Sequence, residues 1–217
     1  MIRSTFPYMD NGNRFGESLP EQIAKHILTK IMKGDLVPGD KIVEDAVATE
    51  LQTSRAPVRE ALYLLQVDNI VERIPRKGTV VKSLTSLEIR EYTEVMIGLI
   101  QMALDFSKDK WTAERIENLT LKLESMTEMF AVNELLGYQQ KATLLTNYLF
   151  EVAENKALSK FYRESVYILN VFAQVKWTIE TMNFYHHKMQ KLIHWIKEND
   201  IEKAKEIIPD LLLETLD

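Results

Sequence analysis

Two arginines stand four residues apart in the segment TSRAPVREAL, residues 53–62, where a helix is expected to begin. Residues at this spacing share one face of a helix, so Arg55 and Arg59 would point the same way. The positive end of the helix dipole disfavours cations there by about 0.3–1 kcal/mol, which an anion from outside the chain could offset. Guanidinium groups suit bidentate contacts with guanine edges or phosphates, and the hydroxyl of Ser54 can cap the helix or donate to a phosphate. The pattern predicts a nucleic-acid contact, and the plainer interpretation is a pair of solvated surface arginines.

Positive charge gathers near these arginines, although the chain as a whole carries a net charge of −5. Residues 1–82 hold 12 Lys+Arg against 11 Asp+Glu, whereas residues 83–217 hold 15 against 21. Within residues 54–82, six basic residues stand against three acidic ones. A locally basic surface of this kind is typical of a nucleic-acid-binding domain.

Other function classes find little support in the sequence. The chain has no cysteine, which excludes disulfides and thiolate metal sites. It has no uncharged apolar stretch of membrane-spanning length, and its N-terminus lacks the apolar core of a signal peptide. We find no phosphate-binding loop, dinucleotide fingerprint, zinc-protease motif or nucleophile elbow. We therefore expect a cytoplasmic protein that is not an enzyme, needs no cofactor and contacts no membrane.

The elements that would position the arginines follow the order of a winged helix-turn-helix. Ser18 and Glu21 have the spacing of a capping box, and Gly34 ends the helix that they begin. Two further helices are expected at residues 44–52 and 55–68. Two strand-like segments then flank the turn PRKG and would form the wing.

Residues 83–217 have a different character, with only two glycines, one proline and long amphipathic runs. We therefore predict a mainly α protein in three parts. The parts are a mobile leader at 1–17, a winged helix-turn-helix DNA-binding domain at 18–82, and an all-α domain of about six helices at 83–217, which would bind an effector and dimerise. The helical runs expected in that domain are 86–107, 112–130, 133–153, 156–181, 183–198 and 200–216.

The N-terminal segment closely resembles the DNA-binding domain of the GntR superfamily of bacterial transcription regulators. The matching motifs are G-x-L-x-P-G at 34–39, SRAPVREAL at 54–62 and RKGTVV at 76–81. The resemblance covers residues 18–82 and implies that the arginines contact an operator while the wing tip approaches the minor groove or its phosphates. In one departure, Asn69 replaces the usual glycine, and asparagine also tolerates the left-handed conformation. The predicted DNA-binding residues are Ser54, Arg55, Arg59, Arg76, Lys77, Gly78 and Thr79.

The helical domain is similar to the effector domain of the FadR-like branch, often called FCD, through AENKAL at 153–158 and LIHWIKENDIEKA at 192–204. Many members of that branch bind a metal through an Asp, a His four residues later and two further histidines, and an arginine often faces the effector. Alignment with that pattern puts apolar residues or threonine at the four ligand positions and at the arginine position, so we expect no bound metal. Those positions are Ala142, Thr146, Met189, Leu211 and, for the arginine, Met96.

One consequence would be an effector pocket of low polarity near Met96, Thr146 and Met189. The commoner interpretation of methionines at such positions is that they line the hydrophobic core. Three histidines, His186, His187 and His194, remain in the same region. Without a carboxylate partner on a facing helix, we interpret them as a surface or interface cluster. His26 is expected to be structural.

Together these features predict a homodimeric transcription regulator that binds a palindromic DNA operator and responds to a small-molecule effector. Repression and activation are both compatible with the sequence. The alternative is a ligand-independent dimeric DNA-binding protein whose helical domain only assembles. A third hypothesis is a helical protein that binds a small molecule and has lost operator binding. The intact pair of arginines argues against it.

Overall fold

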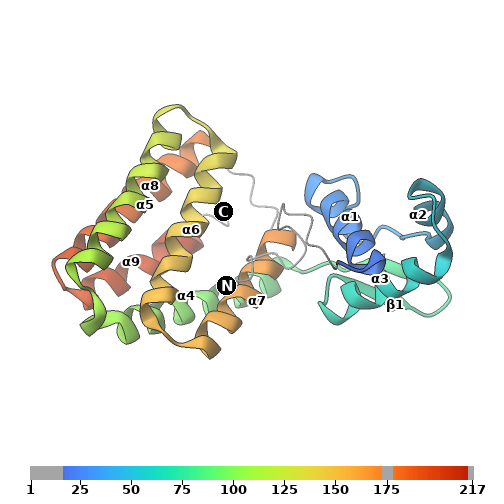
Figure 1. Ribbon diagram of the computed structural model, residues 1–217, viewed down its shortest axis with the longest axis horizontal. Coiled ribbons are helices and arrows are strands. Elements are labelled where there is room, and N and C mark those ends of the chain that lie inside the picture. Colours follow the sequence, from blue (N-terminus) through green and yellow to red (C-terminus); the bar gives the residue numbers. More distant parts are fainter. Residues whose placement is uncertain (1–16, 173–177, 215–217) are drawn as a thin grey trace. The chain divides into compact units, whose positions relative to one another are not determined.

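The computed structural model describes residues 17–172 and 178–214, so all but one residue of the predicted leader lies outside the described part of the chain. Nine α-helices, one 3-10 turn and one two-stranded sheet lie within the described residues (Figure 1). In chain order these are α1 (Leu19–Lys33), α2 (Glu44–Glu50), α3 (Arg55–Val67), β1 (Val71–Ile74), β2 (Gly78–Val81), α4 (Ser86–Ser107), η1 (Lys108–Lys110), α5 (Ala113–Ala131), α6 (Leu135–Ala153), α7 (Lys156–Phe172), α8 (Ile179–Lys197) and α9 (Ile201–Leu213). This is the mainly α architecture that the sequence predicted.

Residue contacts divide the chain into two compact units. The N-terminal unit comprises the described residues of Met1–Ile89 and Val166–Gln174, and the helical unit comprises those of Arg90–Ser165 and Val175–Asp217. The division falls near the predicted boundary at residue 82 and again inside α7. The sequence did not predict that one helix, α7, would be divided between the two units.

Local sequence signals set the ends of the elements in the N-terminal unit. The Ser18 side chain accepts from the backbone N–H of Glu21, whose carboxylate accepts from the Ser18 backbone, which is the predicted capping box. Gly34 ends α1 in the left-handed conformation with φ 81°. Asn69 also takes the left-handed conformation, with φ 59°, at the turn between α3 and β1.

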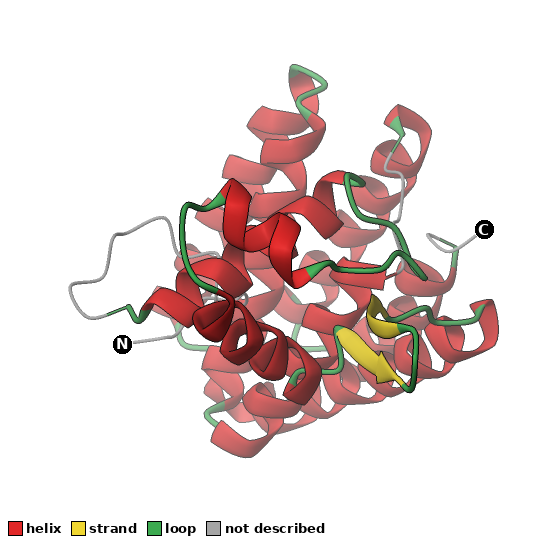
Figure 2. Ribbon diagram, turned by 90° about the vertical axis from the view of Figure 1, so that its right-hand side faces the viewer, coloured by secondary structure: helices red, strands yellow, loops and turns green. Residues whose placement is uncertain are grey.

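The core of the N-terminal unit is built from the apolar faces of its three helices and the inner face of its sheet. The pairing of α1 with α3 dominates it, and Figure 2 shows the small sheet, in yellow, beside these helices. The C-terminal half of α7 adds Tyr167, Val171 and Phe172 to this core. Between α1 and α2, the carboxylate of Glu50 binds both His26 Nε2 at 3.0 Å and Lys30 Nζ at 2.9 Å. His26 thus has the structural role that we expected.

The sheet is a short antiparallel hairpin. Val71 lies opposite Val81 and Ile74 lies opposite Gly78, so the tip consists of residues 75–77. An isolated antiparallel bridge joins Lys41 to Val80 of β2. The order of helices followed by a hairpin is that of a winged helix-turn-helix.

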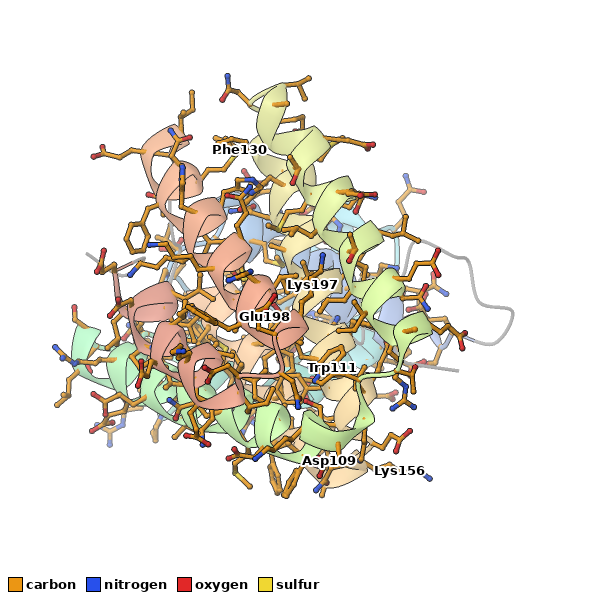
Figure 3. The ribbon with its side chains drawn as sticks, turned by 90° about the vertical axis from the view of Figure 1, so that its left-hand side faces the viewer. Asp109, Trp111, Phe130, Lys156, Lys197 and Glu198 are labelled. Atoms are coloured by element: carbon orange, nitrogen blue, oxygen red, sulfur yellow. The ribbon has the colours of Figure 1, made fainter. Side chains whose placement is uncertain are left out.

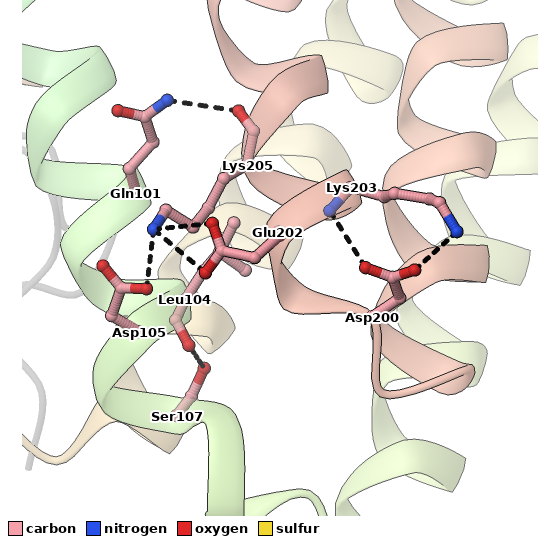
Figure 4. Close-up of polar contacts among 8 residues, drawn as sticks. All are labelled: Gln101, Leu104, Asp105, Ser107, Asp200, Glu202, Lys203 and Lys205. Atoms are coloured by element: carbon pink, nitrogen blue, oxygen red, sulfur yellow. Dashed lines mark hydrogen bonds and ion pairs between the residues drawn. The ribbon is translucent and has the colours of Figure 1, made fainter.

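The helical unit is held by helix packing and by polar contacts at helix ends. In Figure 4 the Nζ of Lys205, on α9, reaches Asp105 of α4 at 2.9 Å and Glu202 of its own helix at 3.4 Å. The amide of Gln101 also donates to the Lys205 carbonyl at 3.2 Å. These contacts join α4 to α9, which are far apart in the sequence.

The predicted boundary between two helices is wrong. The sequence predicted helices over 156–181 and 183–198, whereas α7 ends at Phe172 within the described residues and α8 begins at Ile179. The reason is a local cap: the Thr178 hydroxyl accepts from the Thr181 backbone N–H at 3.1 Å and so begins a new helix.

Candidate nucleic-acid interface

Helix α3 presents both predicted arginines on its exposed face. Its opposite face buries Val58, Ala61, Leu62 and Leu65 in the core, which fixes the rotation of the helix about its axis. Arg55 and Arg59 keep side-chain exposures of 60% and 63%. Pro57 lies in the first turn, where the missing N–H has no helical partner to lose. The structure therefore brings the two guanidinium groups to one accessible face.

Each arginine already has an anionic partner inside the chain. The Nε of Arg59 donates to the Glu44 carboxylate at 2.7 Å, and the Nε of Arg55 is paired with Asp45. Both carboxylates lie in the first turn of α2. Anions inside the chain therefore already offset the unfavourable position of these arginines, because α2 supplies two carboxylates that the sequence alone did not place.

Ser54 occupies the N-cap position of α3, with extended backbone angles, but its side chain makes no capping hydrogen bond. The part of the prediction that gave its hydroxyl a capping role is therefore wrong. The hydroxyl is left to serve as a donor to another group, such as a phosphate oxygen.

The wing tip carries two cations on a tightly turned backbone. Arg76 takes the left-handed region with φ 67°, and Gly78 follows with φ 99°. The backbone N–H of Lys77 donates to the Ile74 carbonyl at 3.2 Å and closes the turn. No carboxylate of the described residues pairs with Arg76 or Lys77, and Thr79 is half-buried on β2. The tip thus presents positive charge that the described residues leave uncompensated.

Lys41 is a cation of this surface that the sequence analysis missed. A methyl group built on Gly78 would lie 3.2 Å from Lys41 Cε, so the lysine side chain runs directly beside the wing tip. The only available signal was its position after the Pro-Gly turn, because the bridge to Val80 that brings it there depends on the tertiary fold.

A shallow hollow of about 530 Å³ lies beside Arg59, between the start of α1 and the middle of α3. Tyr63, one helical turn beyond Arg59, lines it and is strongly exposed. Tyr63 also belongs to the arginine-bearing face and was not predicted there, although its spacing of four residues from Arg59 indicates that position.

The positions expected for metal ligands in the helical unit lie in its core. Ala142, Met189 and Leu211 are buried, and the hydroxyl of Thr146 donates to the Ala142 carbonyl at 3.0 Å. Met96 is half-buried. In the described part of the chain, no group of three or more His, Asp or Glu residues has an arrangement that could hold a metal ion.

The core around Thr146 is more polar than the sequence prediction stated. Burial raises the pKa of Tyr162 strongly and that of Tyr185 to about 12. The nearby hydroxyl of Thr146 lowers the pKa of each tyrosine by hydrogen bonding, which offsets only part of this rise. Burial also raises the pKa of Tyr138 on α6. These hydroxyls stay protonated at neutral pH and can donate hydrogen bonds inside the unit.

The histidines do not form the single surface cluster that we expected. His187 and His194 are exposed, but His186 is only 2% exposed. Its ring stacks on Phe130, which Figure 3 labels on α5, with the ring centroids 4.1 Å apart, and its Nδ1 lies 3.5 Å from the Tyr138 hydroxyl. Burial lowers the pKa of His186, and the neighbouring His187 lowers it further.

None of the helices in the described residues has the length and apolar character needed to cross a membrane. The class of the N-terminal unit follows from three features, which are the accessible arginines of α3, the turn before that helix and the wing. The unit is a winged helix-turn-helix DNA-binding domain.

Comparison with known proteins gives the family of this domain. Residues 19–81 match the bacterial regulatory proteins of the gntR family. YdhC of Bacillus subtilis, an HTH-type transcriptional regulator, is 31% identical over 103 residues, which cover 48% of this chain and 46% of that protein. The gluconate operon transcriptional repressor of the same organism is 31% identical over 112 residues, or 52% and 44% of the two chains. Residues 19–81 are therefore a gntR-family domain.

The chain spans about half the length of the curated relatives it matches. Likeness over the whole fold comes from a solved structure, that of E. coli McbR/YncC. It is 17% identical, covers 92% of this chain and 95% of its own, and has a TM-score of 0.72. That likeness concerns the fold and not the ligands.

Proposed function

We propose that this chain is a DNA-binding transcription regulator of the gntR family and acts in the bacterial cytoplasm. Helix α3 would enter the major groove with Arg55 and Arg59, and the wing would contact the minor groove or its phosphates through Arg76, Lys77 and the backbone around Gly78. The observation that carries the proposal is the exposure of both arginines on one face of α3. Phosphate contacts would fix the position on DNA, and base contacts would supply sequence specificity.

Homodimerisation through the helical unit is the second part of the proposal. Val95, Met102 and Phe106 are exposed apolar residues on α4, and their spacing of seven and four residues puts them on one face. An exposed apolar stripe along a helix is a typical interface between protein chains. A twofold dimer would place two copies of α3 on a palindromic operator.

Effector binding is the third part. The buried hydroxyls near Thr146 and Met189 offer a few polar anchors among apolar side chains, which is the usual chemistry of a small-molecule site. The α4 stripe also supports the alternative, a dimer whose helical unit only assembles. Titration of operator affinity with candidate small molecules separates the two, since only an effector-responsive protein changes its affinity.

The experiment that tests the proposal is selection of duplexes from a random pool by the purified chain, followed by sequencing. We expect enrichment of an inverted repeat by the wild type and none by the Arg55→Ala, Arg59→Ala double variant. Light scattering after gel filtration should give twice the chain mass, and Met102→Glu should lower it. Failure of the wild-type chain to enrich any sequence would refute the proposed function.

A further inference from the structure

The two carboxylates that pair with the arginines of α3 approach them in the same way. Glu44 accepts from the Nε of Arg59 at 2.7 Å, and Asp45 pairs with the Nε of Arg55. Neither arginine has another polar partner among the described residues. Each guanidinium is therefore held through its side edge, and its two terminal nitrogens remain open.

This geometry limits how the arginines can bind DNA. An arginine offers five N–H donors in a planar fork, and a carboxylate on Nε occupies the side edge of that fork. The end of the fork, with both Nη groups, still matches the O6 and N7 acceptors of a guanine in the major groove. A side-on contact with a phosphate would have to displace the carboxylate first.

We propose that Glu44 and Asp45 are specificity-determining positioning residues that hold Arg59 and Arg55 for end-on reading of guanine. This inference rests on the proposed function, and it names the bases that the same surface recognises. Holding a long side chain in one orientation reduces the conformational entropy that binding must remove. The two carboxylates also repel phosphates, so they weaken random binding while the guanine contact is kept.

Both carboxylates suit this role where they stand. They lie in the first turn of α2, where the helix dipole favours negative charge. The Glu44 side chain is 35% exposed and that of Asp45 is 55% exposed, so neither is needed to fill the core. Their removal should leave the fold intact.

The test measures the affinity of each variant for the selected operator and for a random duplex, and takes the ratio. Glu44→Ala should lower this ratio by about 5-fold, which is the lower end of what a whole bidentate base contact contributes to discrimination. Affinity for the random duplex should stay the same or rise, and Asp45→Ala should behave likewise through Arg55. Glu44→Gln, which keeps an acceptor without the charge, should fall between Glu44→Ala and the wild type.

The matched control is Glu60→Ala. Glu60 lies next to Arg59 on the exposed face of α3 and has no ion-pair partner among the described residues, so its removal changes the net charge equally. It should tighten binding to both duplexes alike and leave the ratio unchanged. If Glu44→Ala behaves as this control does, the carboxylate only repels DNA and the inference is wrong.

A second readout tests the guanine contact itself. Replacing each operator guanine in turn with 7-deazaguanine removes the N7 acceptor and keeps O6, so at one position the effect of Arg59→Ala should become smaller. At that same position the effect of Glu44→Ala should become smaller too. An effect of Glu44→Ala that keeps its full size on every modified operator would overturn the inference. The proposed function would stand in that case, because wild-type binding to the operator is measured separately.

Discussion

Two glycine-to-alanine substitutions should change stability in opposite directions. Gly98 lies inside α4, where an added methyl group meets nothing within 4 Å. Alanine there removes the backbone-entropy cost of glycine in a helix, so we expect a gain of about 0.5–1 kcal/mol. Gly78 has φ 99° at the start of β2, a conformation that L-residues avoid, and its added methyl would press on Lys41 Cε at 3.2 Å. A cost of about 1–3 kcal/mol is expected there.

Different assays suit the two sites because they lie in different units. For Gly98→Ala, urea denaturation followed by tryptophan fluorescence reports on the helical unit, which holds Trp111 and Trp195. For Gly78→Ala, hydrogen exchange at the amides of β1 and β2 reports on the wing, and the free energy of opening should fall. A destabilised Gly98→Ala, or unchanged exchange in Gly78→Ala, would refute the reasoning from local conformation.

Further predictions concern charge, protonation and metals. Lys77→Ala should weaken binding to operator and random duplexes alike and reduce the log–log salt slope by about one unit, whereas a loss confined to one base would show that it reads sequence. Because burial lowers the pKa of His186, the unfolded chain binds a proton near pH 6.5 that the folded chain does not. The free energy of unfolding should therefore fall as the pH is lowered from about 7 to about 5.5. His186→Phe should remove this pH dependence, whereas His187→Gln should keep most of it. An unchanged pH dependence in His186→Phe would show that other groups cause it. Elemental analysis of the dialysed protein should find no stoichiometric zinc, nickel or manganese, and a metal lost in His187→Ala would show that the histidines form a site after all.

Helix α3 and the wing could be predicted because their signals are local. Pro57 marks a first helical turn, Asn69 and Gly78 supply left-handed turns, and the capping pair at Ser18 begins α1. Each of these residues acts on its own neighbours in the chain. Sequence reading therefore located the arginines on α3 without knowledge of the tertiary fold.

Contacts made between elements could not be predicted in this way. The pairing of Glu44 with Arg59 joins residues 15 apart, across the turn between two helices. Lys41 reaches the wing only because it bridges to Val80. The break between α7 and α8 was missed because apolar residues continue at helical spacing through it, whereas the cap at Thr178 decides the start of α8.

Contact of α3 with DNA is the central claim, and a fluorescence-anisotropy titration tests it most directly. The selected operator and a random duplex are titrated at one fixed salt concentration with the wild type, Arg55→Ala and Arg59→Ala, each checked for folding by circular dichroism. Each variant should lose about 1–3 kcal/mol of operator affinity and keep its fold, because these side chains point away from the core. Operator affinity equal to that of the wild type in both folded variants would contradict the assignment of α3 as the recognition helix.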